Sequence, residues 1–126
     1  MKMLGLVTLE KIRPNNWNAI DISNEDRAKL KAQMRLSGPE KTEPIVLRKI
    51  GDEWEIVDGE KRWRAAREFG WTHLPAVEVD LTDYEAKKYC VSYNLLRGTV
   101  NFVALGKMAL NDEEMMRVCK ELLGTD

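Results

Sequence analysis

Residues that bind metals or act as nucleophiles are scarce in this sequence. Its 126 residues include one histidine, His73, and two cysteines, Cys90 and Cys119. None of the three has a neighbour at the spacing of a zinc site or a catalytic triad, so neither kind of site is expected. Each cysteine lies in a helical pattern. This predicts reduced, half-buried core residues and favours a cytoplasmic protein.

An excess of either charge is also lacking. The 20 Lys and Arg residues are balanced by 21 Asp and Glu residues, and the formal net charge is -1. Proteins that bind nucleic acid over a broad face are usually clearly positive. The sequence therefore argues against such a face, although a local basic patch is compatible with it.

Long apolar runs are missing as well. No stretch of the sequence approaches the roughly 20 apolar residues that cross a bilayer. The first five residues lack the apolar core and the cleavage site of a signal peptide. We therefore expect no association with a membrane.

The composition that remains is typical of one compact globular domain, at 44% hydrophobic and 33% charged. Apolar patterns bounded by turn residues predict four strands, at residues 6–9, 44–50, 53–57 and 74–79. Helical periodicity predicts five helices, at residues 24–37, 59–70, 83–94, 102–110 and 112–123. No internal repeat, low-complexity run or flexible linker interrupts these elements.

Capping signals mark the starts of the helices. Thr82 followed by Glu85 forms a capping box, in which a hydroxyl precedes a carboxylate by three residues. Gly38 and Pro39 stop the helix that begins near residue 24. Candidate N-caps precede the other helices: Ser23 or Asn24, Asn101, and Asn111 or Asp112.

The stretch at residues 58–66 organises the rest of the chain, because a strand is expected to end there and a helix to begin. Asp58 is a plausible N-cap, and Gly59 leaves the first turn without a Cβ that could screen the backbone amides. A helix start exposes unpaired N–H groups and the positive end of the helix dipole. The stretch is therefore a candidate anion site.

Arg62 lies within the apolar face of this helix. Four apolar residues share that face in projection: Trp63, Ala65, Ala66 and Phe69. A buried guanidinium needs a partner, because an unpaired buried charge is very costly. A phosphate at the helix start would be one partner and a nearby carboxylate the other. The stretch by itself favours neither.

A second arginine, Arg97, follows the apolar face of the helix that begins after Thr82. That face carries Ala86, Tyr89, Cys90 and Tyr93. A cation near a helix C-terminus is stabilised by the helix dipole. Without other information, we therefore interpret Arg97 as a solvated end residue.

Three motifs occur together in a particular order. Residues 44–48 read Pro-Ile-Val-Leu-Arg, residues 59–66 read Gly-Glu-Lys-Arg-Trp-Arg-Ala-Ala, and residues 94–97 read Asn-Leu-Leu-Arg. Together they resemble the N-terminal domain of ParB-type partition proteins, a branch of the ParB/sulfiredoxin fold superfamily. The second motif is close to the G-E-R-R-x-R-A box of that family, and the third matches the core of its E-N-x-x-R box. The resemblance covers about residues 6–110.

The resemblance implies an α/β (α+β) fold, a small mixed sheet of about four strands with flanking helices. Residues 1–110 would form a nucleotide-binding domain. Residues 111–126 would be a C-terminal helix that extends this domain or begins a further region.

The resemblance also implies roles for individual residues toward a nucleoside triphosphate, CTP or ATP, with Mg²⁺. In the family, the second box cradles phosphates, and the third contributes phosphate and magnesium contacts. The loop before residue 44 lies near the base and sugar. The residues implied are Gly59, Glu60, Lys61 and Arg62 at the phosphates, Asn94 near the metal, Arg97 at a phosphate, and Thr42 and Glu43 in the loop.

Two departures from the family pattern bear on catalysis. Tyr93 stands where the family has a glutamate, which removes one carboxylate ligand for magnesium. Lys61 replaces an arginine and so exchanges a planar fork for a point charge. If the domain hydrolyses nucleotide, Asp58 and Glu60 are the candidate catalytic carboxylates and turnover is expected to be slow.

The expected function is that of a nucleotide-binding switch or clamp in DNA partition or regulation. DNA would be read by a missing C-terminal region or by a partner protein, and a homodimer is compatible with the resemblance. Sulfiredoxin chemistry is not expected, because Glu60 stands where that branch has its nucleophilic cysteine.

Two alternatives stay open. One is a small-molecule kinase, because Asp58, Gly59 and Arg62 match the D-G-H-H-R box of free serine kinases, although both histidines are replaced. The other is a degenerate interaction module without nucleotide.

Overall fold

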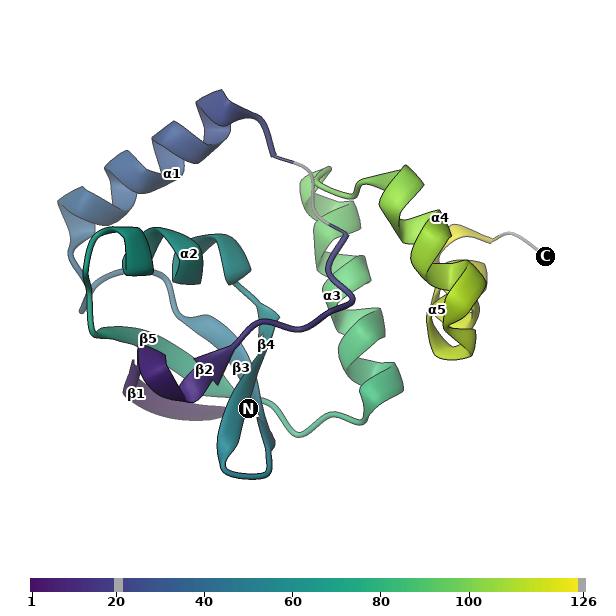
Figure 1. The fold of residues 1–126 in the computed structure, drawn as a ribbon, viewed down its shortest axis with the longest axis horizontal. Helices are drawn as coiled ribbons and strands as arrows, with labels where there is room; N and C mark the ends of the chain where they lie inside the picture. Colours follow the sequence, from purple (N-terminus) through teal and green to yellow (C-terminus); the bar gives the residue numbers. More distant parts are fainter. Residues whose placement is uncertain (20–21, 125–126) are drawn as a thin grey trace. The chain divides into compact units, whose positions relative to one another are not determined.

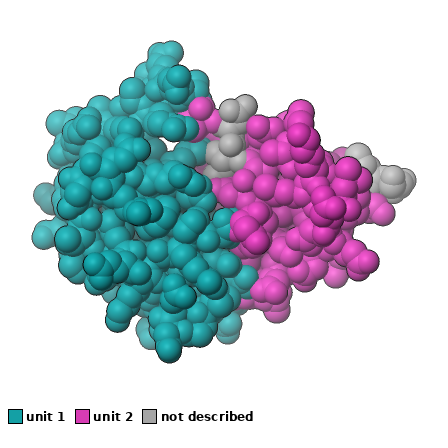
Figure 2. Space-filling view, viewed as in Figure 1, with its two compact units in different colours: residues 1–15, 23–80 teal, residues 16–22, 81–126 magenta. Residues whose placement is uncertain are grey.

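The computed structural model describes residues 1–19 and 22–124. The chain forms two compact units, which Figure 2 shows in different colours. Unit 1 comprises residues 1–15 and 23–80, and unit 2 comprises residues 16–22 and 81–126. Each unit is described by itself below.

Unit 1 is built on a mixed sheet of five strands in the order β1-β5-β3-β4-β2. The strands are β1 (Lys2–Thr8), β2 (Ile12–Arg13), β3 (Ile45–Ile50), β4 (Glu53–Asp58) and β5 (His73–Glu78). The pairs β1–β5 and β3–β4 are antiparallel, whereas β3–β5 and β2–β4 are parallel. This architecture confirms the α/β (α+β) fold with a small mixed sheet.

The strand count was one too low, and the first strand begins earlier than expected. β1 starts at Lys2, and its pairing with β5 is irregular between Met3 and Gly5, where Gly5 has a φ of 70°. Such an irregularity interrupts the alternation of apolar residues from which a strand is predicted. β2 follows a single 3₁₀ turn at Leu9–Lys11 and has two residues, too few to produce a periodic signal.

The helices α1 (Asn24–Ser37) and α2 (Glu60–Glu68) lie on the same side of this sheet (Figure 1). The apolar face predicted for α2 is buried in the core, except that Phe69 is partly buried. Burial of apolar area is the dominant favourable term in folding, so this layer positions α2 on the sheet. The core cluster comprises Leu9, Ile12, Met34, Ile45, Leu47, Ile56, Trp63, Ala65, Ala66, Leu74 and Ala76.

Unit 2 contains α3 (Asp83–Arg97), α4 (Phe102–Asn111) and α5 (Glu113–Leu123). The capping box at Thr82 and Glu85 is confirmed, with both reciprocal hydrogen bonds formed. Asn101 caps α4 by accepting from the Ala104 amide. Of the two candidate caps for α5, Asp112 is the one used, accepting from the Met115 amide at 3.1 Å.

Both cysteines lie in unit 2 as thiols outside any disulfide, and both are more deeply buried than the half-buried positions expected. Cys90 lies on α3 and Cys119 on α5, where burial raises the pKa of the Cys119 thiol. In the part of the chain that the structure describes, no helix is long and apolar enough to span a bilayer.

Candidate functional site

The turn from β4 into α2 is made by Gly59, whose φ of 114° lies in the left-handed region. A Cβ at this position would lie 2.5 Å from Ile45 Cγ2, closer than real atoms approach. Only glycine therefore permits the backbone to pass this close to β3 while it reverses into a helix. The start of α2 is fixed against the sheet by this turn.

The prediction that Asp58 caps α2 was wrong. Gly59 occupies the N-cap position, and no side chain caps the helix. Asp58 is the last residue of β4, where it is paired with Val46 of β3 and is buried. The sharp reversal at Gly59 lets the strand continue through Asp58, so this carboxylate belongs to the sheet.

Arg62 is buried, as its place in the apolar face of α2 requires, with 9% of the residue exposed. A Cβ built on Gly59 would lie 3.1 Å from Arg62 Nη2, so the guanidinium reaches back to the start of its own helix. The Arg62 Nη1 atom pairs with Glu43 Oε2 at 2.8 Å. Within residues 1–19 and 22–124, the buried Arg62 Nε atom has no hydrogen-bond partner.

The ion pair between Arg62 and Glu43 is the carboxylate alternative that the sequence left open. It differs from the buried ion pair that Arg48 forms in unit 1. Arg48 bonds Glu55 Oε1 through Nε at 2.9 Å and through Nη2 at 2.8 Å, and only 8% and 14% of these two side chains are exposed. The Glu43 side chain, in contrast, is 77% exposed. Arg62 is thus a buried cation whose acidic partner is exposed to solvent.

The other charged residues of the Gly59–Ala66 motif lie on α2 as well. Glu60 pairs with Arg64 Nε at 2.9 Å, one helical turn away. Lys61 is partly buried, whereas Arg64, Arg67 and Glu68 are exposed. The first turn of α2 therefore carries the buried Arg62 and two partly buried charges, Glu60 and Lys61.

The loop before β3 belongs to the same unit and contributes Glu43 directly to Arg62. Thr42 is buried, and its hydroxyl donates to the Gly38 carbonyl at 2.8 Å. That bond shapes the loop that carries Glu43. The structure therefore brings Glu43, Gly59 and Arg62 together, with Thr42 next to Glu43 in the chain.

Asn94 and Arg97 belong to unit 2. Asn94 is buried, and its amide nitrogen donates to the Cys90 carbonyl at 2.8 Å while its amide oxygen accepts from the Thr99 hydroxyl at 2.8 Å. Arg97 is exposed near the end of α3, with its guanidinium carbon 5.6 Å from the centroid of the Tyr93 ring. The role of both residues toward a nucleotide stays a prediction.

The residues that the structure describes include no preformed set of acidic, histidine or cysteine ligands for magnesium. No group of three or more His, Cys, Asp or Glu side chains there could hold a metal ion. The amide oxygen of Asn94 is engaged with Thr99. These side chains do not fit a dedicated metal site.

A model of the ParB N-terminal domain matches residues 2–95. The chain belongs to the ParB N-terminal domain family. The nucleoid occlusion protein of Oceanobacillus iheyensis is 34% identical over 93 residues, which are 72% of this chain and 32% of that protein. The chain thus spans about a third of the length of this curated relative.

Solved structures share the fold. The C-terminally truncated chromosome-partitioning protein ParB from Caulobacter crescentus, complexed to the centromeric parS site, has a TM-score of 0.63 and 24% identity, over 96% of this chain and 59% of that one. The same protein complexed with CTP-γ-S gives 0.60 and 23%, over 96% and 64%. A free serine kinase in complex with AMP gives 0.51 and 22%, over 66% and 33%. At these identities the likeness shows the fold alone.

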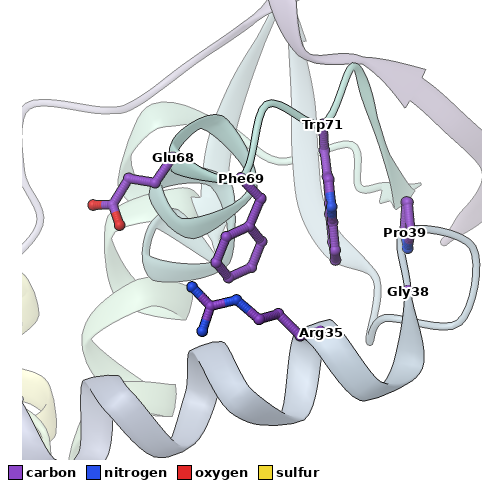
Figure 3. Close-up of a pocket in the computed structure, with 6 residues that line it drawn as sticks. All are labelled: Arg35, Gly38, Pro39, Glu68, Phe69 and Trp71. Atoms are coloured by element: carbon purple, nitrogen blue, oxygen red, sulfur yellow. The ribbon is translucent and has the colours of Figure 1, made fainter.

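The surface pockets of unit 1 in this ParB N-terminal domain include two that the sequence did not predict. One, of about 410 Å³, is shown in Figure 3, where Arg35 extends over the Phe69 ring with its guanidinium carbon 4.5 Å from the ring centroid. The other, of about 510 Å³, lies beside Trp63 and Arg67. The aromatic residues Phe69 and Trp71 line the first of these pockets, and aromatic residues at such positions are equally compatible with a core. Neither pocket is lined by a predicted site residue.

Proposed function

We propose that this ParB N-terminal domain binds a nucleoside triphosphate, CTP or ATP, at the start of α2 and acts as a switch or clamp in DNA partition or regulation. The observation that carries the proposal is Arg62. Its guanidinium is buried, reaches back to the Gly59 turn, and is paired with the exposed carboxylate of Glu43. A phosphate group is the ligand that best completes such a cation.

The backbone of the turn supports the same ligand. The first intrahelical hydrogen bond of α2 runs from the Trp63 amide to the Gly59 carbonyl at 3.1 Å. The amides of residues 60–62 precede it and have no carbonyl within the helix to pair with. A phosphate at the helix start would meet these amides and the positive end of the helix dipole. Lys61, on the same turn, would add a second positive charge.

The wider role is supported by the relatives. Family membership and the likeness to nucleoid occlusion and partition proteins support a part in organising DNA. The fold of the parS-bound and CTP-γ-S-bound ParB structures supports both ligand classes. DNA would be read by a further region or a partner protein. Nucleotide would control how unit 2, with the predicted contacts Asn94 and Arg97, engages its partners, among them a second copy of the chain.

Hydrolysis of the bound nucleotide would be slow. Asp58 and Glu60 are the proposed catalytic carboxylates, but Asp58 is buried in the sheet and Glu60 is paired with Arg64. Tyr93 supplies no carboxylate for Mg²⁺, which the phosphates would then hold largely by themselves. The domain would therefore act mainly through binding.

Isothermal titration of the intact chain with CTP, ATP, GTP and ADP, with and without Mg²⁺, tests the proposal. We expect at least one triphosphate to bind and Arg62→Ala to weaken it about ten- to hundredfold, because hydrogen bonds to a charged group contribute about 1.5–3 kcal/mol. Arg67→Ala, which removes an exposed arginine from the same helix, serves as the control and should bind like the wild type. Equal affinity in a folded Arg62→Ala variant would contradict the proposal.

A phosphotransferase acting on a small hydroxylated molecule is the second candidate. The observations that favour it are the fold shared with a free serine kinase bound to AMP and the match at Asp58, Gly59 and Arg62. Nucleotide-dependent phosphorylation of a panel of hydroxylated metabolites, lost in Asp58→Asn, would support this candidate over the switch. Failure of all four nucleotides to bind would leave the interaction module.

A further inference from the structure

The ion pair between Arg62 and Glu43 joins two side chains in very different surroundings. The Arg62 side chain is 11% exposed, and the Glu43 side chain is 77% exposed. A single contact, from Nη1 to Oε2 at 2.8 Å, connects them. An exposed carboxylate keeps most of its hydration, so it can leave such a pair at a small cost.

The arginine cannot leave in the same way. It emerges from a buried face of α2, and its Nη2 atom lies against the Gly59 turn. Its departure would open the core beside β3, and its remaining in place without an anion would leave a buried charge unpaired. When another anion arrives, Glu43 is therefore the partner that moves.

We propose that the Glu43 carboxylate stands in for a ligand phosphate on Arg62 and is displaced when that phosphate binds. This inference rests on the proposed function and gives Glu43 a definite role within it. Glu43 would be an internal competitor, so a ligand must bring enough negative charge to replace it. The site would then favour polyphosphates over weakly charged molecules of the same size.

The competing possibility is that Glu43 stays in place and contacts the ligand itself, as the position of its loop in the family would suggest. The two possibilities predict opposite effects of the same substitution. Glu43→Gln keeps the shape and an acceptor oxygen for Arg62 but removes the charge. Displacement predicts tighter binding, whereas a direct contact predicts weaker binding.

The test is titration of the intact chain with CTP, ATP and inorganic triphosphate, comparing wild type with Glu43→Gln. We expect binding to tighten about two- to fivefold, the equivalent of losing one partly exposed ion pair. Glu40→Gln is the matched control, because Glu40 is an exposed acid in the same loop with no ion pair recorded among the described residues. It should change affinity by much less. In an Arg62→Ala background, Glu43→Gln should have no effect.

Each outcome decides between the possibilities. Equal or weaker binding by Glu43→Gln, with the wild type binding, overturns the displacement and leaves the nucleotide site standing. An equal gain in Glu40→Gln overturns it too, since general charge would then explain the effect. If neither wild type nor Glu43→Gln binds any of the three probes, the site takes no phosphate, and both the inference and the proposed function fail. Thermal melts of each variant show whether the fold is retained.

Discussion

Gly59 is the residue on which the geometry of the site depends. Its positive φ and its contact with Ile45 are both requirements that only glycine meets. The sequence indicated a glycine at a strand-to-helix junction, and the structure supplies the reason, which is the approach to β3. That approach depends on a residue 14 positions earlier in the chain, and no local pattern could have predicted it.

Replacement of Gly59 by alanine should therefore destabilise the protein. The added Cβ would collide with Ile45 and would sit at a strained φ, and overpacking of a well-packed core typically costs about 1–3 kcal/mol. Chemical denaturation of Gly59→Ala against wild type measures the change. Gly106→Ala is the control, since Gly106 lies inside α4 with nothing within 4 Å of an added Cβ. It should stabilise by about 0.5–1 kcal/mol, and a loss in Gly59→Ala no larger than experimental error would contradict the account.

The buried position of Arg62 was predicted from helical periodicity, but its partner was not. Glu43 lies in a loop 19 residues before Arg62, and a loop has no periodicity from which a contact can be read. The sequence could therefore state that Arg62 needs an anion without deciding between a carboxylate and a phosphate. The structure identifies the carboxylate and shows that it is exposed.

The helices of unit 2 are joined by charged side chains that connect α3 to α5. Lys87 on α3 pairs with Asp112 and Glu114 at the start of α5, at 2.8 Å each. Burial alone would lower the pKa of Lys87, but these two carboxylates outweigh it, and the pKa is raised. Glu121, near the end of α5, accepts from Tyr84 and pairs with Lys88 and Arg117. Local rules predicted the three helices from their caps, but not these contacts between them.

We expect the network around Glu121 to make unit 2 sensitive to acid. The hydrogen bond from Tyr84, followed by that from Lys88, lowers the pKa of Glu121 from its ordinary value of 4.5 to about 2. A carboxyl with a depressed pKa stabilises the folded state above its unfolded pKa, and this contribution is lost as the pH falls through the folded value. We expect the contribution to be complete above about pH 4.5 and to disappear toward pH 2.

Thermal melts followed by circular dichroism at pH 6, 4.5, 3.5 and 2.5 test this expectation. The wild type should lose more of its melting temperature over the acidic steps than Glu121→Gln, which has no charge to lose. Glu113→Gln, at an exposed position on the same helix, should follow the wild type. Identical acid profiles for wild type and Glu121→Gln would show that the network contributes nothing.

At the scale of the whole molecule, the fold was largely predictable because its elements carry local signals. Capping residues, turn glycines and apolar periodicity placed all five helices and the strands β3, β4 and β5. The resemblance to ParB-type proteins then implied the small mixed sheet with flanking helices, but not the order of its strands. The short β2 and the early start of β1 were not predicted, because both depend on pairing with strands far away in sequence.

The candidate site was predictable to the extent that it is contained in one unit. Gly59 and Arg62 lie on one turn, and the motif that holds them could be read directly. Asn94 and Arg97 belong to unit 2. The motif at residues 94–97 identified them as candidates, but a sequence motif does not give their distance from Gly59 and Arg62.

Amide chemical-shift mapping by NMR, with CTP titrated into the intact isotope-labelled chain, is the most direct test that an anion binds at the start of α2. We predict that the largest shifts occur at residues 59–62, with a second group at residues 94–97 if both units share the ligand, and that Arg62→Ala abolishes the first group. Saturable binding with shifts confined to the pockets near Arg35 or Trp71, or no shifts at residues 59–62 at saturating CTP, would contradict the account.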